Sequence, residues 1–329
     1  MLRRKFLPIA VAAGMLLSGP QAGLAQSTEV PGELRTIFES TGETAMTHPA
    51  KSSTLKVPGA KIYYDMQGSG PMLLIIPGGP QDAGVFADVS RHLSNRYTVV
   101  AYDPRGNSRS TFDGEPKELQ LDVQADDAAA LIDVLGGGPA YVFGTSGGAQ
   151  IGLNLAARYP KLVRAVVAHE PPSMMLLPDP SEAVADARNL HNIYRREGVD
   201  AAMQKFFSDN GLSDEQGQEG APPEFAPTPE AAETFARVSG NFEYWLAHGV
   251  VPLSLYRPDV DALRTGKPRV VVGIGKESAG QPIDSMGRAL AAKLGTEPFL
   301  FPGDHMGFDL HADTFAENLH RAFAQGNGV

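Results

Sequence analysis

Short, continuous runs of apolar residues recur along most of the chain, and polar stretches with helical spacing separate them. A hairpin signal comes first, because two strand-like runs, residues 54–57 and 61–65, flank Pro58-Gly59. The later apolar runs cover residues 72–76, 97–102, 140–143, 163–168, 270–274 and 298–301, and the stretches with helical spacing cover 85–93, 121–135, 284–294 and 314–324. A run without polar positions is typical of a strand that is covered on both faces. The alternation of such strands with helices predicts an α/β fold with a mostly parallel, twisted sheet and helices on both faces.

This alternation stops between residues 172 and 267. Helical patterns cover 181–197, 199–207 and 229–247, and a polar stretch rich in Gly and Pro separates the last two. A helical block between two strands of one sheet predicts an insertion that folds over the sheet edge. We therefore expect a core of residues 53–171 and 268–329 with a helical cap of residues 172–267.

Two apolar groups near or within this insertion could line a pocket or simply pack. The aromatic residues Phe242, Tyr244 and Trp245 lie on one predicted cap helix, and core packing is the favoured interpretation for them. Residues 174–177, where the chain leaves the sheet, are the better candidate for an apolar pocket wall.

The N-terminus has the order of a targeting segment. Arg3-Arg4-Lys5 is followed by the apolar residues 6–17 and by the small-residue site Gly23-Leu24-Ala25. We expect a signal peptide over residues 1–25 with cleavage near Ala25, a loosely held leader over 26–52, and a periplasmic or secreted protein. The Arg pair also resembles the twin-arginine signal, so the export route stays open. The apolar run is too short for a stable membrane anchor.

Composition and charge narrow the partners. The chain has 329 residues, 42% of them hydrophobic, which is ordinary for a globular protein, and a formal net charge of -10. That charge argues against nucleic acid and anionic membranes as partners. The chain contains no cysteine, which excludes disulfides and thiolate metal sites, and no closely spaced histidine pair. We expect neither a metal nor a cofactor, and the oligomeric state stays open.

A serine in a glycine-rich turn is the strongest chemical signal. Gly144-Thr145-Ser146-Gly147-Gly148 connects the apolar run 140–143 to a helical stretch, which is the G-x-S-x-G pattern in a strand–turn–helix setting. Such a turn is too crowded for neighbouring side chains. It exposes the serine hydroxyl above the sheet, beside the unpaired N–H groups of a helix N-terminus.

With these features the chain resembles the α/β-hydrolase-fold enzymes that carry a helical cap, over residues 54–325. The turn Asp103-Pro104-Arg105-Gly106-Asn107-Ser108 is similar to a signature turn of the cofactor-free group that includes proline iminopeptidases, haloperoxidases and epoxide hydrolases. The resemblance implies that Ser146 is the nucleophile. Epoxide hydrolases and haloalkane dehalogenases would have aspartate there. It also implies, from the family's chain order, that His305 before the last helix is the base.

The resemblance further implies an oxyanion hole made of two backbone N–H groups. One would come from Gly147, and the other from Pro77-Gly78-Gly79-Pro80, which is similar to the family's His-Gly-Gly-Pro loop. Because proline has no N–H, Gly79 is the favoured donor and Gly78 the second.

The acid that orients His305 has two candidates. In the usual family position, after the strand 270–274, the chain has Gly275-Lys276-Glu277-Ser278, with serine where aspartate is expected. A second known position follows the strand 163–168, where the chain has His169-Glu170-Pro171. We favour Glu170, because Pro171 stiffens the backbone beside it, and keep Glu277 as the alternative.

Together these features predict an exported serine hydrolase that cleaves small esters or related substrates through an acyl-enzyme. A C–C hydrolase, an aminopeptidase or a haloperoxidase-like enzyme could use the same triad. A non-catalytic, ligand-binding pseudo-hydrolase is the alternative outside enzymes, because neither glutamate matches the usual position of the acid.

Overall fold

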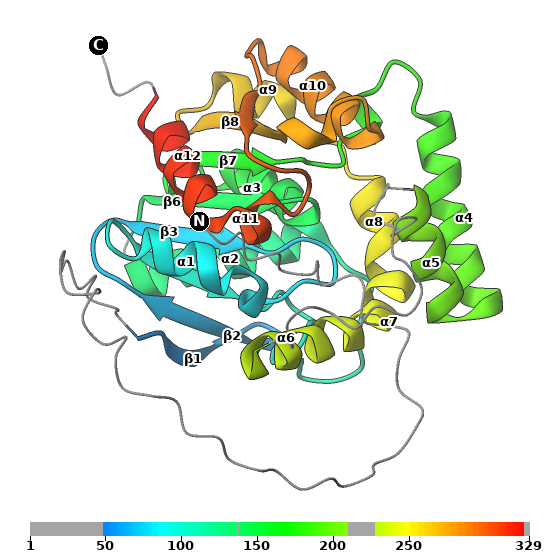
Figure 1. The fold of residues 1–329 in the computed structure, drawn as a ribbon, viewed down its shortest axis with the longest axis horizontal. Coiled ribbons are helices and arrows are strands. Elements are labelled where there is room, and N and C mark those ends of the chain that lie inside the picture. Colours follow the sequence, from blue (N-terminus) through cyan, green and yellow to red (C-terminus); the bar gives the residue numbers. More distant parts are fainter. Residues whose placement is uncertain (1–48, 137, 210–227, 326–329) are drawn as a thin grey trace, which may run out of the picture.

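The computed structural model describes residues 49–136, 138–209 and 228–325. In these residues nine strands form one sheet, with the order β1-β2-β4-β3-β6-β7-β8-β9 and with β5 paired to β2 (Figure 1). β1 and β2 are antiparallel to each other and β2 is antiparallel to β4, whereas every pairing from β4 to β9 is parallel. The strands are β1 (Lys51–Val57), β2 (Ala60–Gln67), β3 (Met72–Ile76), β4 (Thr98–Tyr102), β5 (Thr111–Phe112), β6 (Ala140–Thr145), β7 (Val163–His169), β8 (Arg269–Gly275) and β9 (Phe299–Phe301).

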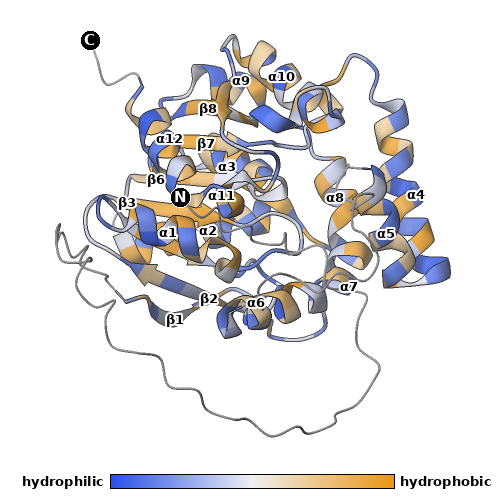
Figure 2. Cartoon of the chain, in the orientation of Figure 1, coloured by the Kyte–Doolittle hydropathy of each residue, from blue (hydrophilic) through white to orange (hydrophobic). Residues whose placement is uncertain are grey.

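Helices cover both faces of the sheet, which explains the continuous apolar runs. Alternate residues of one strand enter different cores: Leu74 and Ile76 of β3 face one side, Leu73 and Ile75 the other. The first core contains residues of α2 (Leu121–Gly136), α3 (Gly147–Arg158) and α10 (Pro282–Leu294). The second contains residues of α1 (Ala87–Leu93), α11 (Gly307–Leu310) and α12 (Ala312–Ala324). Figure 2 shows largely hydrophobic strands between these helices. The helices themselves carry both hydrophobic and hydrophilic residues. The predicted mostly parallel sheet with helices on both faces is confirmed.

Between β7 and β8 the described residues form helices and no strand. They are η3 (Met174–Leu176), α4 (Ser181–Glu197), α5 (Val199–Asp209), α6 (Pro229–Gly240), α7 (Phe242–Tyr244), the π-helical turn η4 (Trp245–Gly249), α8 (Val250–Ser254) and α9 (Val260–Thr265). α4, α5, α7, η4 and α8 lie beside the sheet (Figure 1) and share a third core, which includes Leu190, Met203 and Leu253. Val238 of α6 belongs to the second core instead. Most helices of this segment therefore pack against one another in a separate core beside the sheet.

Several boundaries differ from the sequence prediction. β1 begins at Lys51, two residues before the expected start of the core, because an exposed strand on the sheet edge carries no apolar signal. The predicted helix over 229–247 is interrupted after Gly240. The next residue, Asn241, caps α6, and its side chain donates to the Pro80 carbonyl. The predicted helix over 85–93 begins as the 3-10 turn η2 (Ala83–Phe86).

The predicted signal peptide and residues 26–48 of the leader lie outside the described residues. In the part of the chain that the structure describes, no helix is both long and apolar enough to cross a membrane.

Candidate active site

Ser146 occupies the turn between β6 and α3 in a rare backbone conformation. Its φ is 54° and its ψ is -127°, and it is the N-cap of α3. A Cβ on Gly144 would lie 2.4 Å from the carbonyl oxygen of Gly148, and one on Gly148 would lie 2.1 Å from that of Ile76. Only glycine fits at these two positions, because a side chain would collide with neighbouring backbone carbonyl groups. Holding a non-glycine residue at positive φ costs about 1–3 kcal/mol, which the surrounding contacts must supply.

Glu170 follows β7 directly and meets His305. Its carboxylate oxygen Oε2 lies 2.7 Å from His305 Nδ1, and Oε1 accepts a hydrogen bond of 2.8 Å from the Gly275 N–H. The Glu170 backbone has φ 46°, and its N–H donates to the Gly273 carbonyl of β8. The side chain is fully buried, whereas that of His305 is 21% exposed. A carboxylate at Nδ1 keeps the proton on that nitrogen and leaves Nε2 able to accept one.

The pKa of Glu170 is low although the group is buried. Burial by itself raises this pKa, but the hydrogen bond and charge of His305 outweigh it, with help from His169 and Ser278. Together they hold the pKa at about 2, against an ordinary 4.5. Glu170 is therefore ionised at neutral pH and can stabilise a positive charge on His305.

Glu277, the alternative acid, is exposed in the 3-10 turn η5 (Lys276–Ser278), and its backbone N–H donates to the Gly303 carbonyl. The next residue, Ser278, is buried beside the Glu170 carboxylate. Ser278 occupies the position where the resemblance implies an aspartate. The Glu170 carboxylate, which follows the neighbouring strand β7, lies beside it.

The neighbouring His169 is a core residue. It is fully buried among phenylalanine rings, and its Nδ1 lies 3.2 Å from Thr145 Oγ1. Burial lowers the pKa of His169 to about 4, so the ring is neutral at neutral pH.

The loop of residues 77–82 lies against the Ser146 turn. A Cβ on Gly78 would lie 2.7 Å from Ser146 Cβ, and a Cβ on Gly147 would lie 3.3 Å from the Gly79 nitrogen. The Gly78 N–H donates to Gln81 Oε1 at 3.1 Å, whereas no hydrogen-bond acceptor for the Gly79 N–H is found among the described residues. The Gly79 nitrogen thus lies close to Gly147, and these are the two residues expected to supply the oxyanion hole.

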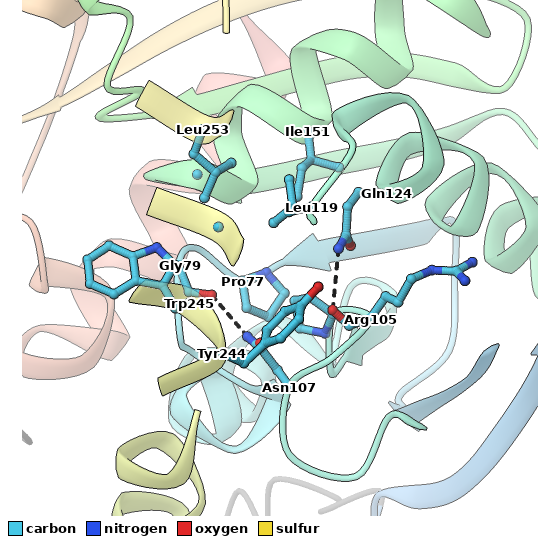
Figure 3. Close-up of a pocket in the computed structure, with 13 residues that line it drawn as sticks. Pro77, Gly79, Arg105, Asn107, Leu119, Gln124, Ile151, Tyr244, Trp245 and Leu253 are labelled. Atoms are coloured by element: carbon cyan, nitrogen blue, oxygen red, sulfur yellow. Dashed lines mark hydrogen bonds between the residues drawn. The ribbon is translucent and has the colours of Figure 1, made fainter. Parts of the chain in front are cut away.

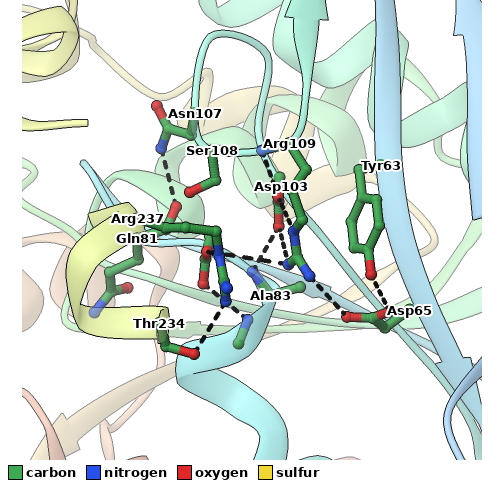
Figure 4. Close-up of polar contacts among 12 residues, drawn as sticks. Tyr63, Asp65, Gln81, Ala83, Asp103, Asn107, Ser108, Arg109, Thr234 and Arg237 are labelled. Atoms are coloured by element: carbon green, nitrogen blue, oxygen red, sulfur yellow. Dashed lines mark hydrogen bonds and ion pairs between the residues drawn. The ribbon is translucent and has the colours of Figure 1, made fainter. Parts of the chain in front are cut away.

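Side chains from both sides hold this loop in place (Figure 4). From the core, Asn107 Nδ2 donates to the carbonyls of Gly79 and Gln81, both at 2.9 Å. From the helical segment, Asn241 Nδ2 donates to the Pro80 carbonyl at 2.8 Å. Arg237 of α6 donates from Nε to the buried Asp82 carboxylate at 2.7 Å. The signature-like turn 103–108 therefore supports the loop rather than taking part in chemistry.

A narrow pocket opens beside Gly79 and Gly147 (Figure 3). Its free interior is about 10 Å³, roughly the space of one water molecule, so a substrate enters only if wall side chains move. Trp245 is buried in the third core, as the favoured interpretation expected, and Tyr244 and Trp245 also line the pocket. Sequence reasoning missed this because a helix pattern does not show which apolar residue faces a cavity. Leu176 belongs to the first core and lines a different cavity, of about 350 Å³, together with Val260 and Arg264 of α9.

The comparisons with known proteins agree with this architecture. Residues 71–232 match the family model described as the alpha/beta hydrolase fold. The chain is 34% identical over 275 residues to the uncharacterized hydrolase YraK of Bacillus subtilis (strain 168), covering 82% of this chain and 94% of that protein. The chain belongs to the α/β-hydrolase family.

Two further comparisons extend the likeness. The chain is 29% identical to the zearalenone hydrolase of Bionectria ochroleuca over 277 residues, which is 80% of this chain and 95% of that protein. A thermophilic esterase from Thermogutta terrifontis has a similar fold, with a TM-score of 0.64 at 19% identity, covering 84% of this chain and 98% of that one. The α/β-hydrolase fold expected from the sequence is confirmed, and the chain is a hydrolase.

Proposed function

We propose that this α/β-hydrolase is a serine esterase or lactonase that acts on small molecules through an acyl-enzyme. The observation that carries the proposal is the 2.7 Å contact between Glu170 and His305 Nδ1. Glu170 directly follows His169, whose carbonyl accepts a hydrogen bond from the Ser146 N–H. The esterase among the similar structures supports ester cleavage, and the similar proteins compared by sequence are named hydrolases.

In the proposed reaction Ser146 Oγ attacks the substrate carbonyl while His305 Nε2 accepts its proton. Glu170 stabilises the imidazolium, and the N–H groups of Gly79 and Gly147 stabilise the oxyanion. His305 then protonates the leaving alcohol, which leaves an ester on Ser146. Water, activated by the same histidine, releases the acid and restores the serine hydroxyl.

The Glu170–His305 contact also weighs against a pseudo-hydrolase, since the ground for that alternative was the unusual position of the acid. C–C bond hydrolysis, aminopeptidase and haloperoxidase-like activity would use the same side chains, but no contact in the described residues favours them over ester cleavage.

Hydrolysis of p-nitrophenyl esters of short carboxylic acids tests the proposal. The protein should release p-nitrophenol, and Ser146→Ala should reduce turnover by at least about 10³-fold. If the Ser146→Ala variant kept near-normal turnover, the nucleophile would lie elsewhere and the proposal would be wrong. The same series of acids measures which acyl lengths the pocket accepts.

A further inference from the structure

One buried side-chain acceptor in the pocket wall lacks a hydrogen-bond partner in the described residues. Gln124 of α2 lines the pocket and is 1% exposed, and its Oε1 accepts no hydrogen bond from those residues. Three other polar side chains of the wall are engaged elsewhere. Arg105 pairs with Asp127, Asn107 holds the 77–82 loop, and Tyr244 donates to the Lys117 carbonyl.

The orientation of the Gln124 amide follows from its neighbour. Nε2 faces the carbonyl oxygen of Arg105 at 3.4 Å (Figure 3), and a carbonyl can only accept a hydrogen bond. The flipped amide would place two oxygens against each other. Oε1 therefore remains an acceptor, and burying it without a donor is unfavourable.

The position of the pocket indicates which part of a substrate would meet this acceptor. Its wall includes Gly79 and Gly147, which are proposed to bind the carbonyl oxygen, together with the apolar residues Leu119, Ile151 and Leu253. Ser146 and His305 are not part of the wall, but Ser146 directly precedes the wall residue Gly147. Because the histidine protonates the leaving alcohol, that alcohol lies on the histidine side, and the pocket is left for the acyl group.

We propose that Gln124 Oε1 binds a hydroxyl or amide N–H on the acyl part of the substrate, so that the enzyme prefers acyl groups that carry a hydrogen-bond donor. This inference rests on the proposed function and adds the substrate class to it. The apolar wall favours an otherwise hydrophobic acyl chain, and the donor gives specificity because an analogue without it leaves the buried oxygen unpaired.

Two pairs of p-nitrophenyl esters, matched in shape, test the preference. One pair is the 3-hydroxybutyrate and the 3-methylbutyrate, which differ by hydroxyl against methyl. The other is the N-acetylglycinate and the acetoxyacetate, which differ by N–H against oxygen. In at least one pair kcat/KM should be about tenfold or more higher for the ester with the donor, the scale of one hydrogen bond.

Gln124→Met, an apolar residue of similar volume, should bring that ratio close to one by slowing the ester with the donor. Gln150→Met is the matched control. Gln150 of α3 is fully buried, donates from Nε2 to the Pro172 carbonyl and also lacks a described partner for Oε1, but it does not line the pocket. Its variant should keep the wild-type ratio.

A wild-type ratio near one in both pairs would overturn the inference without any variant, and so would a ratio that Gln124→Met leaves unchanged. In either case hydrolysis that depends on Ser146 would still support the proposed function. If none of the four esters, nor the plain short-chain esters, were cleaved, the proposed function itself would fail.

Discussion

At the scale of single residues, Glu170 carries the least ordinary part of the site. It is buried, has a positive φ and bonds both His305 and the Gly275 N–H. Glu170→Gln keeps the shape but removes the charge that stabilises the imidazolium. We expect turnover of a p-nitrophenyl ester to fall by about 10³–10⁴-fold, the scale for loss of the orienting acid.

The control for this variant is Glu277→Gln, because Glu277 is exposed and comes from the loop that usually supplies the acid. It should change turnover less than about threefold, since its effect would arise only through weak surface electrostatics. Equal losses in the two variants would contradict the assignment of Glu170.

The low pKa of Glu170 also predicts a dependence of stability on pH. The pKa is about 2 in the folded chain and about 4.5 in the unfolded chain, so the ionised group stabilises the fold above pH 4.5. This contribution is lost as the pH falls from 4.5 towards 2. Melting temperatures measured across that range should fall more steeply for the wild type than for Glu170→Gln. Parallel curves would show that the carboxylate is not stabilised by folding.

At the scale of elements, α6 is tied to the 77–82 loop through Arg237 and Asn241. Arg237→Ala leaves the buried Asp82 with Arg109 as its nearest cation, at 4.0 Å. We expect a loss of about 1.5–3 kcal/mol in the free energy of unfolding, the range for a hydrogen bond to a charged group. We also expect a several-fold fall in kcat/KM, because the loop carries Gly79. Denaturant unfolding and ester hydrolysis measure the two effects.

Arg188→Ala is the matched control, since Arg188 is exposed on α4 of the same helical segment. It should change neither quantity appreciably. If Arg237→Ala lowered stability but left kcat/KM unchanged, α6 would support the fold without positioning the loop.

The elements also show what the sequence could and could not reveal. Strands such as β3 were predictable because burial on both faces leaves a continuous apolar run, and the Ser146 turn because its glycines are fixed by local crowding. The choice between Glu170 and Glu277 needed the register of β7 and β8, which no local pattern encodes. Gln124 could not be singled out from the sequence either, because one amide on an amphipathic helix gives no signal until the pocket beside it is known.

At the scale of the whole molecule, the N-terminal 25 residues predict export, and this prediction does not depend on the candidate active site. The order of basic, apolar and small residues predicts removal of residues 1–25 during export. Mass spectrometry of the protein from its native host should find an N-terminus near Gln26, outside the cytoplasm. An intact Met1 on a cytoplasmic protein would contradict export.

The route can be tested on the same chain. Replacing both Arg3 and Arg4 with lysine keeps the positive charge but removes the arginine pair. If export uses the twin-arginine route, the variant should stay in the cytoplasm with its signal peptide uncleaved. Unchanged export would assign the chain to the general secretory route.

The central claim, that Ser146 is an activated nucleophile, is tested most directly by covalent labelling. A fluorophosphonate reacts with an activated serine hydroxyl by losing fluoride, and peptide mass spectrometry identifies the modified residue. The account predicts complete labelling of the wild type on the peptide that contains Ser146, slower labelling of Glu170→Gln and none of Ser146→Ala. A wild-type protein that does not react, or a label on any other serine, would contradict it.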